Sequence, residues 1–139
     1  MILPILLVLA LVSSVSSHVS AQNANILAEQ QVRKFEQAFR DSYNKHGLMG
    51  IFIYFTPDFI SINEAGQIKN KTEHLKYLSH YYAPKYFFYP QRQAHFDYGT
   101  SPNLYVSYYH DQLLWVYTLV PNRALLGGYQ VKKLAVASK

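Results

Sequence analysis

The hydrophobic pattern of the chain changes from a helical to a strand-like spacing in its second half. Between residues 25 and 45, apolar side chains recur every three or four residues, which is the spacing of one helix face. The charged pair Glu36 and Arg40 lies on another face, in the order that favours an ion pair along a helix. The pattern predicts an amphipathic first helix, with these residues on its buried stripe: Ala28, Val32, Phe35, Phe39 and Tyr43.

A stretch that is apolar on every side follows at residues 48–55, and we interpret it as a short buried helix. The Thr56-Pro57 step ends this helix, because a proline drives the preceding residue towards an extended conformation. Asp58 then opens a strand of aromatic and β-branched residues, and Gly66 provides the positive φ angle of a turn. These signals predict a short β-hairpin.

Helical spacing returns after the hairpin, with Leu75, Leu78 and Tyr82 on one face of a third helix. Asn70 stands three residues before Glu73, as in a capping box, so its side chain is a candidate to begin this helix. The same asparagine opens the glycosylation sequon Asn70-Lys71-Thr72. Both interpretations of Asn70, a helix cap and a glycosylated residue, stay open at this stage.

The Ala83-Pro84 step ends the third helix, and the chain then changes to long aromatic and β-branched runs separated by turn signals. The clearest turn is at residues 99–103. The run at residues 104–120 is too long for one ordinary strand, so residues 110–112 form either a tight turn or a bulge. The last strand is predicted at residues 126–136. The mature chain is therefore expected to be one α+β unit of three helices followed by a curved antiparallel sheet.

The N-terminal segment has the features of a secretory signal peptide. Residues 2–12 are apolar and uncharged, a serine-rich region follows, and Val19-Ser20-Ala21 is a small-x-small cleavage site. A membrane-spanning helix needs about 20 apolar residues, and this run is much shorter. The segment therefore fits a signal peptide better than a membrane anchor. We therefore expect residues 1–21 to be removed, residues 22–139 to form the domain, and the protein to be secreted, with no membrane association after cleavage.

Composition narrows the function classes. The chain contains no cysteine, so an ordinary hydrophobic core and not a disulfide framework must hold it. Its formal net charge is +5, but the cations are scattered, whereas a nucleic-acid site would gather them on one face. No nucleic-acid partner is expected.

His74 and His80 are six residues apart on one helix, a spacing that does not bring two ligands onto one metal ion, so no metal or other cofactor is expected.

The order of these elements resembles the cone-shaped fold of the nuclear transport factor 2-like superfamily. The residues that carry the resemblance are the Phe55-Thr-Pro-Asp-Phe59 step and the turn Asn63-Glu-Ala-Gly66. The chain also resembles the small, secreted, uncharacterised animal members of that superfamily. The resemblance implies an α+β fold in which three N-terminal helices pack in the concave face of a curved, mostly antiparallel sheet.

Steroid isomerases of this fold use a tyrosine on the first helix and an aspartate before the hairpin turn. The resemblance places those two functions at Phe39 and Asn63 of this chain. A phenylalanine ring cannot donate a hydrogen bond to an oxyanion, and an amide cannot act as a general base. The resemblance therefore extends to the fold and does not extend to that catalytic pair.

Two other residues are weak candidates for catalysis. His95 and Asp97 are two apart in a predicted strand and share a face, where a carboxylate could orient an imidazole. Alternating polar residues on a solvated sheet face explain them equally well. An isomerase or cyclase that uses this pair is the enzymatic alternative, although we expect no catalysis.

Tyrosine is abundant, with 13 residues in the chain. A tyrosine hydroxyl needs a partner, which suits a wet cavity or an interface, although tyrosine is also a good strand residue. We predict a pocket for a small apolar or aromatic ligand. The alternative is a homodimer through the outer face of the sheet. The residues expected to line the pocket are Phe39, Tyr54, Phe55, Asn63, Phe96, Tyr105 and Trp115.

Overall fold

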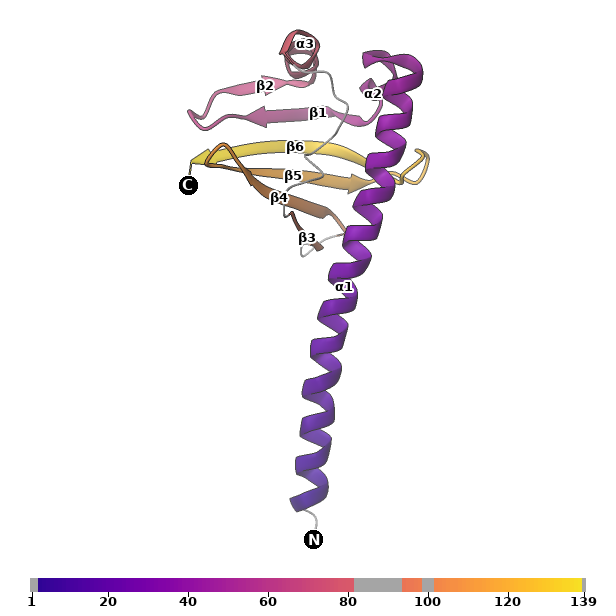
Figure 1. The fold of residues 1–139 in the computed structure, drawn as a ribbon, viewed down its shortest axis with the longest axis vertical. Helices are drawn as coiled ribbons and strands as arrows, with labels where there is room; N and C mark the ends of the chain where they lie inside the picture. The colour runs from indigo at the N-terminus through magenta and orange to yellow at the C-terminus, as the bar shows by residue number, and fades with distance from the viewer. Residues whose placement is uncertain (1–2, 82–93, 99–101, 139) are drawn as a thin grey trace.

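The computed structural model describes residues 3–81, 94–98 and 102–138, which form three helices and six strands (Figure 1). The helices are α1 (Leu3–His46), α2 (Leu48–Phe52) and α3 (Lys71–Tyr81). The strands are β1 (Phe55–Ile62), β2 (Ile68–Asn70), β3 (His95–Tyr98), β4 (Leu104–His110), β5 (Leu113–Pro121) and β6 (Tyr129–Ser138). The α+β architecture predicted from the sequence is confirmed, with α1 packed against a six-stranded, open, curved sheet.

Helix α1 begins at Leu3, well before the position near Asn25 that the amphipathic pattern suggested. It extends beyond the sheet at its N-terminal end and crosses the strands with its C-terminal part (Figure 1). Four of the five predicted core positions of α1 are buried and Tyr43 is half-buried, so the buried stripe is confirmed. None of the described helices contains a stretch that is long and apolar enough to span a bilayer.

The second helix is shorter than its apolar pattern suggested, because α2 ends at Phe52 and β1 begins at Phe55 instead of Asp58. The cause is a tertiary contact: the Val131 N–H donates to the Tyr54 carbonyl at 2.7 Å, and Phe55 pairs with Val131 in β6. Pro57 is exposed within the irregular stretch between the paired residues Phe55 and Ile60. A proline is tolerated there because it removes no ladder hydrogen bond.

The sheet order is β2-β1-β6-β5-β4-β3, so the first long strand lies beside the last one. The β1 and β6 pair is parallel, and the other four pairs are antiparallel. Strands β4 and β5 form a hairpin through Asp111 and Gln112, whose φ angles are 52° and 62°. Two consecutive positive φ angles are the geometry of a tight two-residue hairpin turn. The alternative left open at residues 110–112 is therefore decided in favour of the turn.

Asn70 caps α3, as one of the two interpretations of its sequence predicted. Its Oδ1 accepts the Glu73 backbone N–H at 2.9 Å, which satisfies one of the free donors at the helix start. Gly66 has a φ angle of 79° in the β1–β2 turn, as expected. The predicted helix end at Ala83-Pro84 lies outside the described residues.

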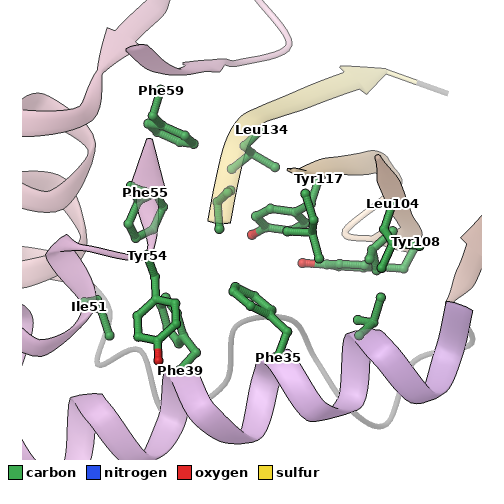
Figure 2. Close-up of a cluster of buried hydrophobic side chains, with 14 of the residues drawn as sticks. Phe35, Phe39, Ile51, Tyr54, Phe55, Phe59, Leu104, Tyr108, Tyr117 and Leu134 are labelled. Carbon is green, nitrogen blue, oxygen red and sulfur yellow. The ribbon is translucent and has the colours of Figure 1, made fainter. Parts of the chain in front are cut away.

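The two faces of the sheet differ along the same strands. In β4, Leu104, Val106 and Tyr108 are buried, whereas the alternate residues Tyr105 and Ser107 are half-buried on the other face. Helix α1 covers the face with the buried residues, and we call it the inner face; the opposite side is the outer face. The β5–β6 connection also rests on α1, because a Cβ atom on Gly127 would lie 2.9 Å from the Phe35 Cα atom. Figure 2 shows a cluster of buried hydrophobic side chains that lie between α1 and the inner face.

Candidate functional site

Seven of the 16 buried hydrophobic residues in the described ranges are aromatic, and several of them meet between α1 and the sheet. Phe35 and Phe39 project from α1 towards Tyr54 and Phe55, which come from the connection between α2 and β1 (Figure 2). The Phe39 ring centroid lies 5.8 Å from that of Tyr54 and 6.1 Å from that of Phe55, both in edge contacts. Phe55 in turn contacts Phe59 at 4.9 Å. These distances are typical of favourable edge-to-face pairs, so the cluster holds α1 against the start of the sheet.

Three of the residues predicted to line a pocket, Phe39, Tyr54 and Phe55, belong to this cluster, and all three are buried. The Tyr54 hydroxyl donates to the Leu126 carbonyl at 3.1 Å. Burial, and secondarily the negative charge of Asp41, raises the pKa of Tyr54 above its ordinary value. Tyr54 therefore stays protonated and ties the β5–β6 connection to the interior.

A second group of rings lies on the inner face of β4 and β5. We call Tyr108, Trp115 and Tyr117 the aromatic platform. The Trp115 ring is nearly parallel to that of Tyr108, with an interplanar angle of 2° and a centroid distance of 6.3 Å. Tyr108 and Tyr117 are buried, but Trp115 is only partly buried against them, and its Nε1 donates to the His110 carbonyl at 3.3 Å. The platform therefore reaches from the interior to solvent at Trp115.

The other predicted lining residues lie in different places. Phe96 is partly buried on β3 against the core, and the Arg33 guanidinium lies 5.3 Å from its ring centroid. Tyr105 alternates with the buried residues of β4 and lies on the outer face. Asn63 lies in the β1–β2 turn, where its Oδ1 accepts the backbone N–H groups of Ala65 and Gln67 at 3.1 and 2.9 Å. These bonds make a local turn motif, which the sequence Asn63-Glu-Ala-Gly66 was expected to form.

His95 and Asp97 do share one side of β3, as their spacing predicted. Both are exposed, and they pair across β4 with Ser107 and Tyr105 of the outer face. Phe96 and Tyr98, which alternate with them, are the residues that pack against the core. The pair therefore lies on the side of the sheet opposite to the aromatic cluster.

The interior also contains a neutral imidazole that the sequence did not single out as part of a site. His74 comes from α3 and is buried, with its ring 5.8 Å from Phe55 and 5.0 Å from Phe59. Burial, and secondarily the charge of Lys69, lowers the pKa of His74 to about 4. A polar but uncharged ring therefore lies among the phenylalanines at neutral pH.

Glu36 was expected with its partner Arg40 on a helix face other than the buried stripe, but only 3% of its surface is exposed. Its Oε1 accepts from Arg40 Nη2 at 2.5 Å, and its Oε2 lies 3.7 Å from Arg33 Nη1. Burial raises the pKa of Glu36, while the charges of Arg40 and Arg33 oppose that increase. Its position next to Phe35 on the edge of the buried stripe is the sequence signal that could have revealed it.

Within the ranges that the structure describes, no group of three or more histidine, aspartate or glutamate side chains is placed to hold a metal ion. The buried titratable groups, Glu36 and His74, lie instead among arginines and aromatic rings respectively.

The chain is similar to several solved structures of bacterial proteins. The chain is similar to ActVI-ORFA from Streptomyces coelicolor, with a TM-score of 0.50, 11% identity, and coverage of 78% of this chain and 95% of that one. An NTF-2 like protein of unknown function from Pseudomonas aeruginosa has a TM-score of 0.45 and 13% identity, with coverage of 78% and 95%. An NTF2-like protein of unknown function from Pseudomonas putida has a TM-score of 0.46 and 12% identity, with coverage of 85% and 88%.

No protein-family model matches the chain, and no curated protein matches it. At 11% identity, the likeness to ActVI-ORFA shows a common fold and no more. Two of the solved structures reported above are described as NTF2-like proteins of unknown function. A shared fold does not carry a function, so the function must be argued from the side chains of this chain.

Proposed function

We propose that this protein is a secreted binding domain for a small apolar or aromatic ligand, which it holds between α1 and the inner face of the sheet. The observation that carries the proposal is the aromatic platform, where a partly exposed Trp115 adjoins the buried rings of Tyr108 and Tyr117. Ligand sites are typically apolar and aromatic with a few polar groups that fix orientation. Glu36 and His74 are polar groups of this kind on the same side of the sheet.

The inner face of the sheet is unusual for a core that serves stability alone. Leucine, isoleucine and valine fill interiors with well-defined rotamers, whereas tyrosine and tryptophan bring polar atoms that need partners. On β4 and β5, aliphatic side chains fill one end of the inner face, at Leu104 and Leu119, and the platform occupies the other end. A flat apolar ligand that stacks on Trp115 would use this second end.

Tryptophan fluorescence tests the proposal, because Trp115 is the only tryptophan in the chain. Titration with a panel of aromatic and lipid compounds should shift or quench its emission, with saturation at a defined ratio. Tyr117→Leu, which removes a platform ring, should weaken binding of the ligand. Tyr109→Leu, on the outer face, is the matched control and should leave the affinity unchanged. A panel without any saturable response would contradict the proposal.

Secretion is part of the proposal and rests on the N-terminal sequence. Residues 2–12 are apolar, and Val19-Ser20-Ala21 offers a cleavage site. Expressed in a eukaryotic secretory host, the protein should reach the medium with Gln22 as its first residue. Retention in the membrane fraction with Met1 intact would show that the segment is an anchor.

Glycosylation of Asn70 accompanies the secreted interpretation, and the observed cap is compatible with it. A glycan is attached to the Nδ2 atom, whereas the cap uses Oδ1, so one asparagine can serve both functions. Asn70 is also exposed. Glycosidase treatment should increase the mobility of the secreted protein, and Thr72→Ala should abolish that shift while leaving the Oδ1 cap in place. An unmodified secreted protein would limit Asn70 to its structural role.

A homodimer through the outer face of the sheet is the second candidate. Its centre is made of small and apolar residues on adjacent strands, with Val116 opposite both Ser107 and Ala135 in the pairing register. These side chains are half-buried, and they lie on the face of the sheet opposite to α1. Sedimentation should detect a dimer that Val116→Lys dissociates and that Glu64→Lys, in the β1–β2 turn, does not. A monomer at all concentrations would exclude this candidate.

A further inference from the structure

One buried oxygen atom in the interior has an unmet hydrogen-bonding capacity. Both carboxylate oxygens of Glu36 lie in a side chain that is 4% exposed, but only Oε1 accepts a hydrogen bond, from Arg40. Within the described part of the chain no donor reaches Oε2, and the Arg33 Nη1 atom lies at 3.7 Å, beyond hydrogen-bond distance. A buried acceptor without a donor is costly, and such groups in native proteins commonly have a functional cause.

The position of Glu36 connects this oxygen to the proposed ligand site. Glu36 follows Phe35 on α1, and its neighbour Arg33 lies over the Phe96 ring on β3. Phe96 pairs with Val106 on β4, and Val106 pairs with Tyr117 of the aromatic platform on β5. Glu36 thus lies on the helix that covers the inner face, and its ion-pair partner Arg33 reaches that face at Phe96, two strands away from the platform residue Tyr117.

The charges around Glu36 limit what can bind its free oxygen. Arg33 and Arg40 lie at 3.7 and 2.5 Å from the two carboxylate oxygens, and Arg33 also lies 3.8 Å from the exposed Glu29, so the two arginines balance the two glutamates. A charged ligand would add an unbalanced charge to this group. A neutral O–H or N–H group would instead provide the missing donor without adding charge, and a hydrogen bond to an ionised acceptor is stronger than one between neutral groups.

We propose that Oε2 of Glu36 is the polar recognition point of the ligand site, and that the ligand is a neutral aromatic molecule with one hydroxyl or N–H donor, such as a phenol. This inference rests on the proposed binding function and specifies its ligand class. The apolar body of the ligand stacks on the platform, and its donor hydrogen-bonds to Glu36. Burial holds the pKa of Glu36 above its ordinary value, but the two arginines favour the ionised form that accepts the hydrogen bond.

A matched pair of probes tests the inference. 2-Naphthol and 2-fluoronaphthalene have nearly the same shape, but only the first can donate a hydrogen bond. In equilibrium dialysis, the native protein should bind 2-naphthol at least about tenfold more tightly, as expected for a hydrogen bond to a charged group. Glu36→Gln should remove most of this preference, because an amide N–H₂ group in the place of Oε2 cannot accept. Glu29→Gln, an exposed glutamate on the same helix and also near Arg33, should keep it.

The possible results separate this inference from the function on which it rests. Equal affinity of the native protein for both naphthalenes would overturn the role of Glu36 while leaving the apolar pocket in place. A preference for 2-naphthol that survives in folded Glu36→Gln would also overturn it, since the donor would then bind elsewhere. Saturable binding of neither probe would contradict the binding function itself. The comparison of the two probes on the native protein holds even if Glu36→Gln does not fold.

Discussion

The inner and outer faces of the sheet are made by the same strands, yet they have different roles. Along β4 the residues alternate between Val106 or Tyr108, which are buried under α1, and Ser107 or Tyr109, which are not. Tyr108 and Tyr109 are neighbours of identical chemistry, but Tyr108 is 2% exposed and Tyr109 is 51% exposed. Side-chain direction in a strand alternates with every residue, so position decides the role of a tyrosine and composition does not.

The largest expected effect tests whether the inner face carries the stability of the domain. Phe39→Ala should lower the free energy of unfolding by about 3–5 kcal/mol, because it removes a ring that contacts Phe35, Tyr54 and Phe55. Tyr109→Ala on the outer face should cost less than about 1 kcal/mol. Urea denaturation of both variants gives the two values. Similar losses for the two variants would remove the distinction between the faces.

Acid should lower the free energy of unfolding, because it protonates His74, which is buried in the interior. Its pKa in the folded protein is about 4, against 6.5 in the unfolded chain, so the unfolded state binds the proton more readily. The contribution of neutral His74 to the free energy of unfolding is fully present above about pH 6.5. It is lost as the pH falls towards 4, and the loss is at most about 3 kcal/mol.

Stability measured against pH for the native protein and for His74→Gln isolates this effect by subtraction. The subtraction is needed because Glu36, with a raised pKa, contributes with the opposite sign. His95→Gln, which removes an exposed imidazole from the other side of the sheet, is the control. A parallel pH profile for the native protein and His74→Gln would contradict the expectation.

Two adjacent glycines test how closely the β5–β6 connection rests on α1. Gly127 and Gly128 have φ angles of 86° and 77°, so alanine is strained at either position. Only at Gly127 would the new Cβ meet the helix, at 2.9 Å from the Phe35 Cα atom; nothing lies within 4 Å of it at Gly128. Gly127→Ala should therefore cost about 1–3 kcal/mol more than Gly128→Ala in thermal or urea unfolding. Equal costs would show that strain alone acts at both positions.

The smallest expected effect concerns the far edge of the sheet. Asn70→Ala should cost about 1 kcal/mol of stability, because it removes the acceptor for the Glu73 N–H at the start of α3. Thr72 lies two residues further on and is exposed, so Thr72→Ala should lower the stability by no more than a few tenths of 1 kcal/mol. Comparison of the unglycosylated forms by urea denaturation separates the cap from any effect of a glycan.

The sequence predicted those features that depend on local spacing. The stripe of Ala28, Val32, Phe35 and Phe39 follows directly from helical periodicity, and all four are buried. The turn at Gly66 was visible for the same reason, since turn residues act on their own backbone, whereas at residues 110–112 the sequence left a turn and a bulge open. The predicted architecture followed from the order of these local signals.

Features that depend on distant partners could not be predicted in the same way. The start of β1 at Phe55 is caused by pairing with Val131, more than 70 residues later. The helical period places Glu36 at the edge of the buried stripe, but its burial depends on how far the packing against α1 extends beyond that stripe. Asn63 was assigned to a pocket by resemblance, while its local turn chemistry explains its observed bonds. The placement of Tyr105 on the outer face follows from a strand register that only the whole sheet defines.

The parallel pairing of β1 with β6 has a consequence for the order of folding. Strand β6 is central, and β1 can be paired on that side only after residues 129–138 have been synthesised. Until then, β1 and the antiparallel β5 each present an unpaired edge, and the two halves of the nascent chain cannot join. Long-range pairing of this kind slows folding, because a large loop must close before its contacts are made. A nascent chain paused before residue 129 is thus expected to need protection of its exposed edges, for which chaperones are the usual means.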